Sequence, residues 1–149
     1  MRGAVIRRLR SGDFESWHRL FHQYLEFYRE ELEQDVVRET FSRLVAERGS
    51  LFGLIALSHE DEPVGIVNCV MHATTWSKGP TCYLEDLFVV EAARGTGLAR
   101  HLIAQAKQEA SRRGGGRIYW HTQAFNGRAR SLYDQVARLT SLVVYEEEL

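Results

Sequence analysis

The chain has 149 residues and a formal net charge of −1, which predicts a single domain spanning residues 1–149 and gives no basic field that would point to a nucleic-acid partner. No apolar run approaches the ~20 residues that cross a bilayer, and none of signal length follows the basic N-terminus that begins with Arg2. We therefore expect a cytoplasmic protein without a membrane partner. The two cysteines, Cys69 and Cys82, match no zinc spacing and are expected to be reduced and buried.

Strands and helices alternate in the first half of the chain. A first strand is followed by Asp13, the expected N-cap of a helix that carries an aromatic stripe at helical spacing and runs to about Glu31. A second helix and two paired strands around a polar turn come next. The expected elements are, in order, a strand over Ala4–Leu9, the two helices, strands over Leu51–Leu57 and Val64–Met71, and a loop over Ala73–Thr81.

The second half has the order of strand–helix–strand units. A strand over Cys82–Val90 leads through a glycine turn into a helix. Three consecutive glycines mark the end of this helix. The helix is expected over Leu98–Arg113, and it is followed by a strand over Ile118–Gln123, a helix over Arg128–Arg138 and a closing strand over Leu142–Tyr145. Strand pairs early and βαβ-like units late predict a mixed α/β fold with helices on both faces of the sheet.

The turn after Cys82–Val90 places two glycines at the start of a predicted helix, where bare backbone N–H groups bind phosphate. A P-loop requires Lys and then Ser or Thr after its last glycine, and Leu98 stands there instead. A dinucleotide fingerprint requires a third small residue where Arg100 stands. It also requires an acidic residue at the next strand, Ile118–Gln123, which has none. The sequence therefore disfavours both a P-loop and a dinucleotide-binding motif.

The pattern Arg94-x-x-Gly97-x-Ala99, directly after a strand, resembles the acetyl-CoA signature of the GNAT N-acetyltransferase superfamily. The resemblance implies that N–H groups from Gly95 to Arg100 hold the pyrophosphate of acetyl-CoA as co-substrate, with glycines avoiding Cβ clashes. A purely structural glycine turn is the alternative. The cofactor-binding residues so implied are Leu87, Phe88, Val89, Arg94, Gly95, Thr96, Gly97, Leu98, Ala99, Arg100, Asn126 and Tyr133.

A second motif follows the next predicted strand. Asn126-Gly127-Arg128-Ala129-Arg130-Ser131-Leu132-Tyr133 is similar to the Asn-x-x-Ala-x-x-Leu-Tyr of GNAT proteins. The resemblance implies that Asn126 contacts the pantetheine arm and that the Tyr133 hydroxyl lies by the CoA sulfur. Each residue also has a simpler interpretation, Asn126 as an N-cap and Tyr133 as a core aromatic. The ordered pair of motifs favours the acetyltransferase interpretation.

The resemblance implies the GNAT fold, a mixed α/β domain with a central, mostly antiparallel twisted sheet of six to seven strands. Two stretches, Cys82–Val89 and Tyr119–Gln123, look like the branch that includes polyamine and histone acetyltransferases. The chain departs from the usual pattern after Tyr133, where no Gly-Phe pair follows and a single strand, not a hairpin, fits before Leu149. A sheet that is one strand short leaves an edge in need of cover, so we expect a homodimer.

The implied reaction is direct transfer of the acetyl group of acetyl-CoA to a primary amine in a ternary complex, without a metal. The amine belongs to a small molecule or a protein lysine. A main-chain N–H near Phe88 would polarise the thioester carbonyl. Tyr133 is the expected acid for the departing thiolate. Tyr24 and Tyr28, at the far end of the aromatic stripe, are candidate residues of the substrate entrance.

The acceptor amine must lose a proton, and Glu85 is the candidate base. Strand alternation places it on one face with Leu87 and Val89, and places Asp86 on the other face with Leu84 and Phe88. The resemblance to polyamine enzymes implies that Asp86 holds the cation. His121 is a second candidate base.

Other functions remain compatible with these residues. A non-catalytic acyl-CoA-binding or sensor domain on the same fold is the main alternative, and a nucleotide-binding oxidoreductase is more distant because the acidic ribose partner is missing. Among amines, a polyamine, a protein lysine, an amino acid and an aminoglycoside all stay open.

Overall fold

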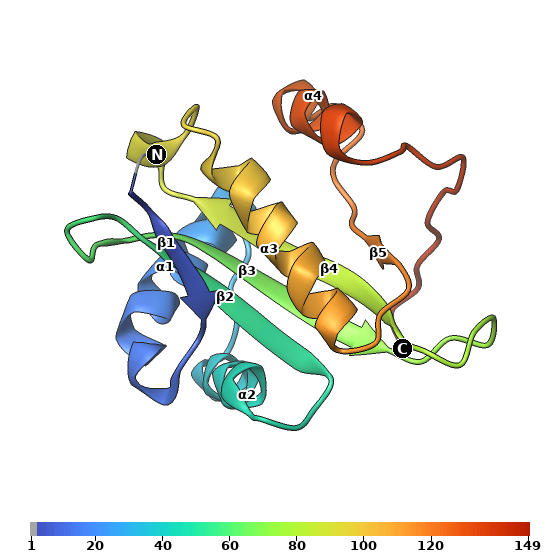
Figure 1. Cartoon of the computed structure of the whole chain (residues 1–149), viewed down its shortest axis with the longest axis horizontal. Coiled ribbons are helices and arrows are strands. Elements are labelled where there is room, and N and C mark those ends of the chain that lie inside the picture. Colours follow the sequence, from blue (N-terminus) through green and yellow to red (C-terminus); the bar gives the residue numbers. More distant parts are fainter. Residues whose placement is uncertain (1–2) are drawn as a thin grey trace.

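The computed structural model describes residues 3–149, so Met1 and Arg2, the first residue of the basic N-terminus, lie outside the described residues. Five strands form one sheet in the order β1-β2-β3-β4-β5 (Figure 1). All neighbours pair antiparallel except β4 and β5, which pair parallel. The strands are β1 (Val5–Arg8), β2 (Leu51–Leu57), β3 (Pro63–His72), β4 (Thr81–Val89) and β5 (Ile118–Tyr119).

Helices cover both faces of the sheet, as the sequence predicts (Figure 1). One face packs against α1 (Phe14–Phe27) and α2 (Gln34–Val45), and the other against α3 (Leu98–Arg112) and α4 (Gly127–Val136). Two short 3-10 turns, η1 (Ser11–Asp13) and η2 (Glu91–Ala93), precede α1 and α3. None of the helices in residues 3–149 is long and apolar enough to cross a bilayer.

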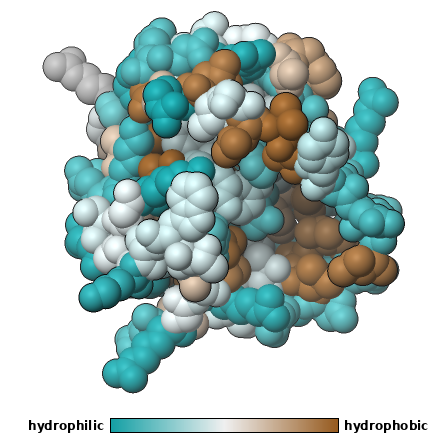
Figure 2. All heavy atoms as spheres, turned by 90° about the vertical axis from the view of Figure 1, so that its right-hand side faces the viewer, coloured by the Kyte–Doolittle hydropathy of each residue, from teal (hydrophilic) through white to brown (hydrophobic). Residues whose placement is uncertain are grey.

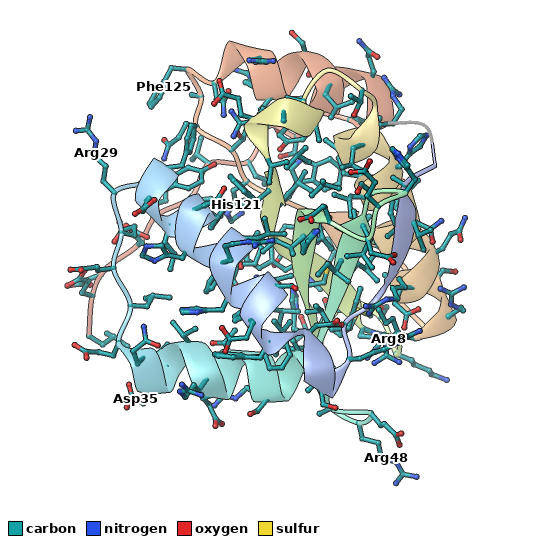
Figure 3. All side chains as sticks on the ribbon, turned by 90° about the vertical axis from the view of Figure 1, so that its left-hand side faces the viewer. Arg8, Arg29, Asp35, Arg48, His121 and Phe125 are labelled. Atoms are coloured by element: carbon teal, nitrogen blue, oxygen red, sulfur yellow. The ribbon has the colours of Figure 1, made fainter. Side chains whose placement is uncertain are left out.

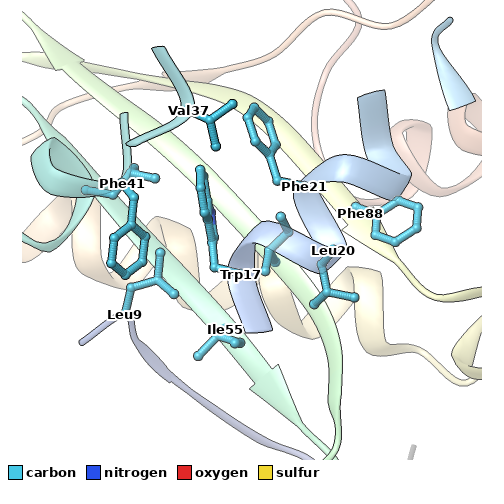
Figure 4. Packing of buried hydrophobic residues seen from close by; sticks show 10 residues of the cluster. Leu9, Trp17, Leu20, Phe21, Val37, Phe41, Ile55 and Phe88 are labelled. Carbon is cyan, nitrogen blue, oxygen red and sulfur yellow. The ribbon is translucent and has the colours of Figure 1, made fainter. Parts of the chain in front are cut away.

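The aromatic stripe of α1 forms the core under that face of the sheet (Figure 4). Trp17 is fully buried, and its ring stacks on Phe21 with centroids 4.8 Å apart. Phe41 of α2 and Ile55 of β2 complete this layer. The stripe changes character toward the end of the helix, because Tyr24 is only half-buried and Tyr28 is exposed. The first part of the stripe is therefore core, whereas its end is not.

Helix α1 ends at Phe27, four residues before the predicted limit at Glu31. Arg29 takes a left-handed conformation, with φ of 56°, although that position usually carries glycine. Its N–H donates to the Glu26 carbonyl, and the Glu30 N–H donates to the Leu25 carbonyl, which is the bond pattern of a Schellman motif. Because no glycine marks this end of the helix, the sequence pattern predicts a helix that is too long.

The sheet has five strands in the described residues rather than the six to seven predicted. The strand expected over Ile118–Gln123 keeps only the two residues of β5. The strand expected over Leu142–Tyr145 does not form, and its side chains are exposed. These residues have high β propensity, but a strand is stabilised by its neighbours, and here no neighbouring strand lies beside them. Cys69 and Cys82 are free and buried, as predicted.

Candidate functional site

Strands β4 and β5, which flank the predicted cofactor site, separate from each other after a short paired stretch. Parallel pairing between β4 and β5 stops at Tyr83 and Tyr119, so the rest of β4 has no strand on that side. A pocket of about 530 Å³ lies beside this open edge. The following predicted site residues line it together: Tyr24, Tyr28, Leu87, Phe88, Val89, Arg94, Gly95, Gly97, Leu98, Ala99, Arg100, Asn126 and Tyr133.

The glycine turn at the start of α3 is built for a ligand that approaches the backbone. Gly95 and Gly97 have φ of 75° and 86°, a conformation that other residues adopt only with strain. No atom lies within 4 Å of the position of a Cβ at either glycine, so the space above the turn is open. Gly97 is the N-cap of α3 and provides no side-chain hydrogen bond to the first turn. The positive end of the helix dipole therefore faces the pocket, which suits a phosphate.

The charged and hydroxyl side chains of this turn form hydrogen bonds to neighbouring protein groups. The Arg94 guanidinium donates to the Val89 carbonyl at 3.0 Å and lies over the Phe88 ring. Thr96 is not among the pocket-lining residues, and its hydroxyl donates to the Ala93 carbonyl. Arg100 donates to the side chain of Gln135 in α4, which ties the helices on either side of the pocket together.

Backbone groups of β4 point alternately toward β3 and toward the pocket. The Val90 N–H donates to the Val64 carbonyl of β3. Because every second residue of an antiparallel strand bonds to the same neighbouring strand, the N–H of Phe88 also faces β3. Leu87 and Val89 then direct their N–H and C=O groups toward the open edge, in agreement with the bond from Arg94 to the Val89 carbonyl. The main-chain donor predicted near Phe88 is therefore offered by its neighbours.

Helix α4 supplies the opposite wall of the pocket. Asn126 is its N-cap, and the side-chain oxygen accepts a hydrogen bond from the Ala129 N–H at 3.2 Å. The capping interpretation is thus correct, and because Asn126 also lines the pocket, the two interpretations are compatible. Tyr133 packs edge-on against Trp120. Burial, with a smaller contribution from Tyr28, raises the pKa of Tyr133, so this hydroxyl keeps its proton near neutral pH.

A β-bulge in β4 changes the predicted faces of the acidic pair. Asn68 of β3 pairs with Asp86, but the next residue, Cys69, pairs with Leu84, which makes Glu85 the extra residue. The prediction that Asp86 shares a face with Leu84 is therefore wrong. Leu84 packs on the α3 face, whereas Asp86 contacts residues of the α1 face, where Phe88 also packs.

Asp86 lies directly behind the pocket wall. Its carboxylate accepts a hydrogen bond from the Asn68 amide at 3.0 Å, and the hydroxyl of Tyr24, which lines the pocket, lies close enough to stabilise the anion. Burial raises the pKa of Asp86, and these two donors offset part of that rise by stabilising the anion. Burial and the charge of Asp86 raise the pKa of Tyr24 in turn, so Tyr24 remains a donor.

Glu85 and His121 do not line the pocket. Glu85 is exposed at the bulge, where partial burial and the nearby charge of Asp86 raise its pKa. The His121 ring lies against Tyr83, whose hydroxyl is 3.3 Å from Nδ1. Tyr83 also stacks on Tyr119, which places His121 in an aromatic cluster at the start of the open edge. In Figure 3, Arg29 and Phe125 extend into solvent on the side of the molecule that α1 covers.

Five pocket residues are absent from the sequence-based prediction: Phe27, Ala93, Arg128, Ala129 and Leu132. The last three belong to the Asn126–Tyr133 motif, and helical spacing from Asn126 would have identified Ala129 and Tyr133 as neighbours on one face. Phe27 is the last residue of α1 and directly precedes Tyr28 in the sequence. Ala93 has no signal of its own, because its place depends on the 3-10 turn η2.

The mixed α/β fold carries a pocket between the glycine turn of α3, the open edge of β4 and α4, and comparison with known proteins identifies the family. The model of the Acetyltransferase (GNAT) family matches residues 15–137. This chain belongs to that family.

Two relatives have similar sequences over most of their length. D-amino-acid N-acetyltransferase HPA3 of Saccharomyces cerevisiae is 32% identical over 143 residues, which cover 95% of this chain and 89% of that protein. The uncharacterized N-acetyltransferase YhfO of Bacillus subtilis is 32% identical over 130 residues, which cover 87% and 86% of the two chains. The relatives thus support N-acetyl transfer as the class of activity.

Solved structures show the same fold at lower identity. Aminoglycoside N-acetyltransferase AAC(6')-Iy, bound to a bisubstrate analogue, aligns with a TM-score of 0.85 over 98% of both chains at 19% identity. Ribosomal-protein-alanine N-acetyltransferase from Brucella melitensis biovar Abortus 2308 aligns with a TM-score of 0.77 over 99% of this chain and all of that one, also at 19% identity. The mixed α/β fold with helices on both faces is therefore that of GNAT proteins.

Proposed function

We propose that this protein transfers the acetyl group of acetyl-CoA directly to a primary amine. The observation that carries the proposal is the shared pocket. The left-handed glycine turn of α3, the open edge of β4, and Asn126 and Tyr133 of α4 all line one cavity. A purely structural glycine turn would not need two left-handed residues beneath open space.

The chain offers a matched set of groups to such a co-substrate. The N–H groups between Gly95 and Arg100 face a phosphate with the dipole of α3 behind them. Outward-facing backbone groups of Leu87 and Val89 can pair with an amide-bearing arm as an added strand would. Acetyl-CoA supplies the activated thioester.

Tyr133 is the proposed proton donor to the leaving thiolate. Its hydroxyl lines the pocket, and its raised pKa keeps it protonated over the working pH range. An N–H group of Leu87 or Val89 at the open edge is the proposed donor to the thioester oxygen, where charge develops.

Glu85 and Asp86 are proposed to receive the amine. An alkylammonium with pKa ~10.4 costs about 4.6 kcal/mol to deprotonate at pH 7, so a nearby base accelerates the reaction. The exposed Glu85 can pass the proton to solvent, and Asp86 behind Tyr24 attracts the cation. His121 remains a second candidate base at the edge of this region. Tyr24 and Tyr28 form the aromatic entrance between the acceptor and the pocket.

The experiment has two arms. Calorimetric titration with acetyl-CoA measures binding, and a screen of amines with thiol-release detection measures transfer. The screen includes polyamines, a lysine peptide, aminoglycosides and both enantiomers of amino acids, since a relative is a D-amino-acid N-acetyltransferase. Absence of binding at millimolar acetyl-CoA would contradict the proposal. Binding without acetylation of any amine would favour the acyl-CoA-sensor alternative.

We also propose a homodimer. Leu142, Val143, Val144 and Tyr145 are between 67% and 92% exposed, which is unusual for four consecutive apolar residues in a monomer. Figure 2 shows apolar side chains around a hollow on the side of the molecule that carries β5 and this segment. A second copy that lies against this side would bury these side chains and cover the short strand β5.

A further inference from the structure

Asn68 is a buried polar residue in the middle of the central strand β3. Its side chain is 4% exposed and contacts two partners from different elements. The Trp17 indole of α1 donates to the Asn68 oxygen at 3.0 Å, and the Asn68 nitrogen donates to the Asp86 carboxylate at 3.0 Å. A buried amide with two satisfied bonds is stable, but most core positions of a strand are filled by apolar residues.

The direction of these bonds is determined by chemistry. The Trp17 indole nitrogen can only donate, so the amide end that faces it must be the oxygen. The amide nitrogen of Asn68 therefore faces Asp86, and a flipped amide would leave the Trp17 donor and one Asp86 oxygen without partners. Trp17 is fully buried, which prevents water from replacing its bond to Asn68.

The bulge connects this polar chain to the pocket. Because Glu85 is the extra residue, Asp86 pairs directly with Asn68 and lies on the α1 face. One Asp86 oxygen, Oδ2, accepts from Asn68, and the hydroxyl of the pocket residue Tyr24 also stabilises the carboxylate. The amide consequently limits rotation of a carboxylate that is in contact with the pocket wall.

We propose that Asn68 is a positioning residue of the acceptor site, whose amide, oriented by the Trp17 indole, holds the Asp86 carboxylate in place to attract a cationic amine. This inference rests on the proposed function, because it assumes that an amine is the acceptor. It predicts that Asn68 affects the amine and not acetyl-CoA, since its contacts are on the α1 face.

The test compares Asn68→Leu, which keeps the branched shape but makes no hydrogen bonds, with Ile55→Ala, a cavity variant in the same core layer beneath α1. In Asn68→Leu we expect the KM for the amine to rise about 10-fold or more and the Kd for acetyl-CoA to stay within about twofold. The acid limb of kcat/KM should move to higher pH, because the Asp86 anion loses a donor. Ile55→Ala should lower Tm without moving that limb.

Two further variants make the result specific. Trp17→Phe removes the indole donor, so the Asn68 amide can rotate and the acid limb should shift in the same direction. In an Asp86→Asn background, Asn68→Leu should add little to the amine KM, because the two residues act as one unit. Additive effects of these two substitutions would overturn the proposal.

The pKa of Asp86 provides a readout that does not need turnover. Carboxyl carbon NMR of the purified protein, with Asp86→Asn for assignment, should show this pKa rising in Asn68→Leu. An unchanged titration overturns the inference whether or not the protein acetylates amines, and so does a shifted titration with an unchanged amine KM. Failure of the proposed function is a different result, namely absence of acetyl-CoA binding in the unmodified protein.

Discussion

The Tyr24 hydroxyl lies beside the Asp86 carboxylate and stabilises its anion, and this contact joins the end of α1 to the bulge of β4. Tyr24 lines the pocket, whereas Asp86 lies behind it. The two residues are far apart in the sequence, and only the packing of α1 on the sheet brings them together. The proposed acceptor side of the site therefore depends on a contact between a helix end and an irregular strand.

Removal of the Tyr24 hydroxyl tests this contact. Asp86 ionises with a pKa above its usual value because of burial, and Tyr24 is one of the two donors that stabilise the anion. In Tyr24→Phe the pKa of Asp86 should rise further, so the acid limb of kcat/KM for the amine should move to higher pH. Steady-state kinetics between about pH 5 and 9 measure this shift. An acid limb at the same pH in both proteins would show that this contact does not control the proposed acceptor site.

Asp86→Asn should raise stability while it lowers activity. A carboxyl whose folded pKa is raised holds its proton more tightly when folded, so its contribution to stability is greatest at low pH. That contribution decreases as pH rises from the unfolded pKa, ~3.9, to the folded value. At pH 7 the variant should therefore have a higher Tm than the wild type, with kcat/KM for the amine about 10- to 100-fold lower. The Tm gain should shrink as the pH is lowered toward 4, and a lower Tm at both pH values would contradict this account.

Tyr133→Phe should separate catalysis from binding. The substitution removes only the hydroxyl, so the packing against Trp120 and the pocket wall is retained. We expect kcat to fall about 100-fold, the low end of general acid catalysis, and the Kd for acetyl-CoA to change less than twofold. Stopped-flow turnover and calorimetry measure the two quantities, and an unaltered kcat would exclude Tyr133 as the acid.

Gly97→Ala should weaken co-substrate binding through the backbone. A side chain at φ of 86° costs about 1–2 kcal/mol, and the new methyl group would occupy the open space above the turn. We expect lower stability and a Kd for acetyl-CoA at least 10-fold weaker, since phosphate approaches the N–H groups closely. Gly116→Ala is the matched control, because Gly116 also has open space around its Cβ position but no left-handed φ. Equal affinity in both variants would indicate a structural turn only.

Truncation after Thr140 tests the proposed dimer. It removes the exposed apolar residues Leu142 to Tyr145 while leaving every helix and strand intact. Multi-angle light scattering should give twice the chain mass for the full protein and a single chain mass for the truncated one. A monomeric full-length protein at micromolar concentration would argue against the homodimer.

Local patterns account for what the sequence predicts well. The glycine turn depends on residues within a few positions of one another, and its left-handed conformations follow from Gly95 and Gly97 themselves. The predicted limits of β2 match the structure because apolar residues are continuous there. The N-cap position of Asp13 is also correct, although its carboxylate pairs with Arg7 rather than capping α1.

Features without a local signal could not be predicted. The bulge at Glu85 carries no glycine or proline, so strand alternation assigned the wrong face to Asp86 relative to Leu84. The role of Asn68 has no local signal, because its partners lie 51 and 18 residues away in the sequence. The end of α1 depends on a left-handed Arg29, and arginine gives no hint of that conformation.

Where β4 separates from β5, any ligand that binds the open edge adds to the stability of the fold. Backbone groups of Leu87 and Val89 at this edge have no strand to pair with, so a ligand that pairs with them binds the folded chain and not the unfolded one. At a ligand concentration 100 times the Kd, the gain in unfolding free energy is about 2.7 kcal/mol. For the proposed co-substrate, acetyl-CoA, resistance of the protein to unfolding and proteolysis would therefore rise with the concentration of the ligand.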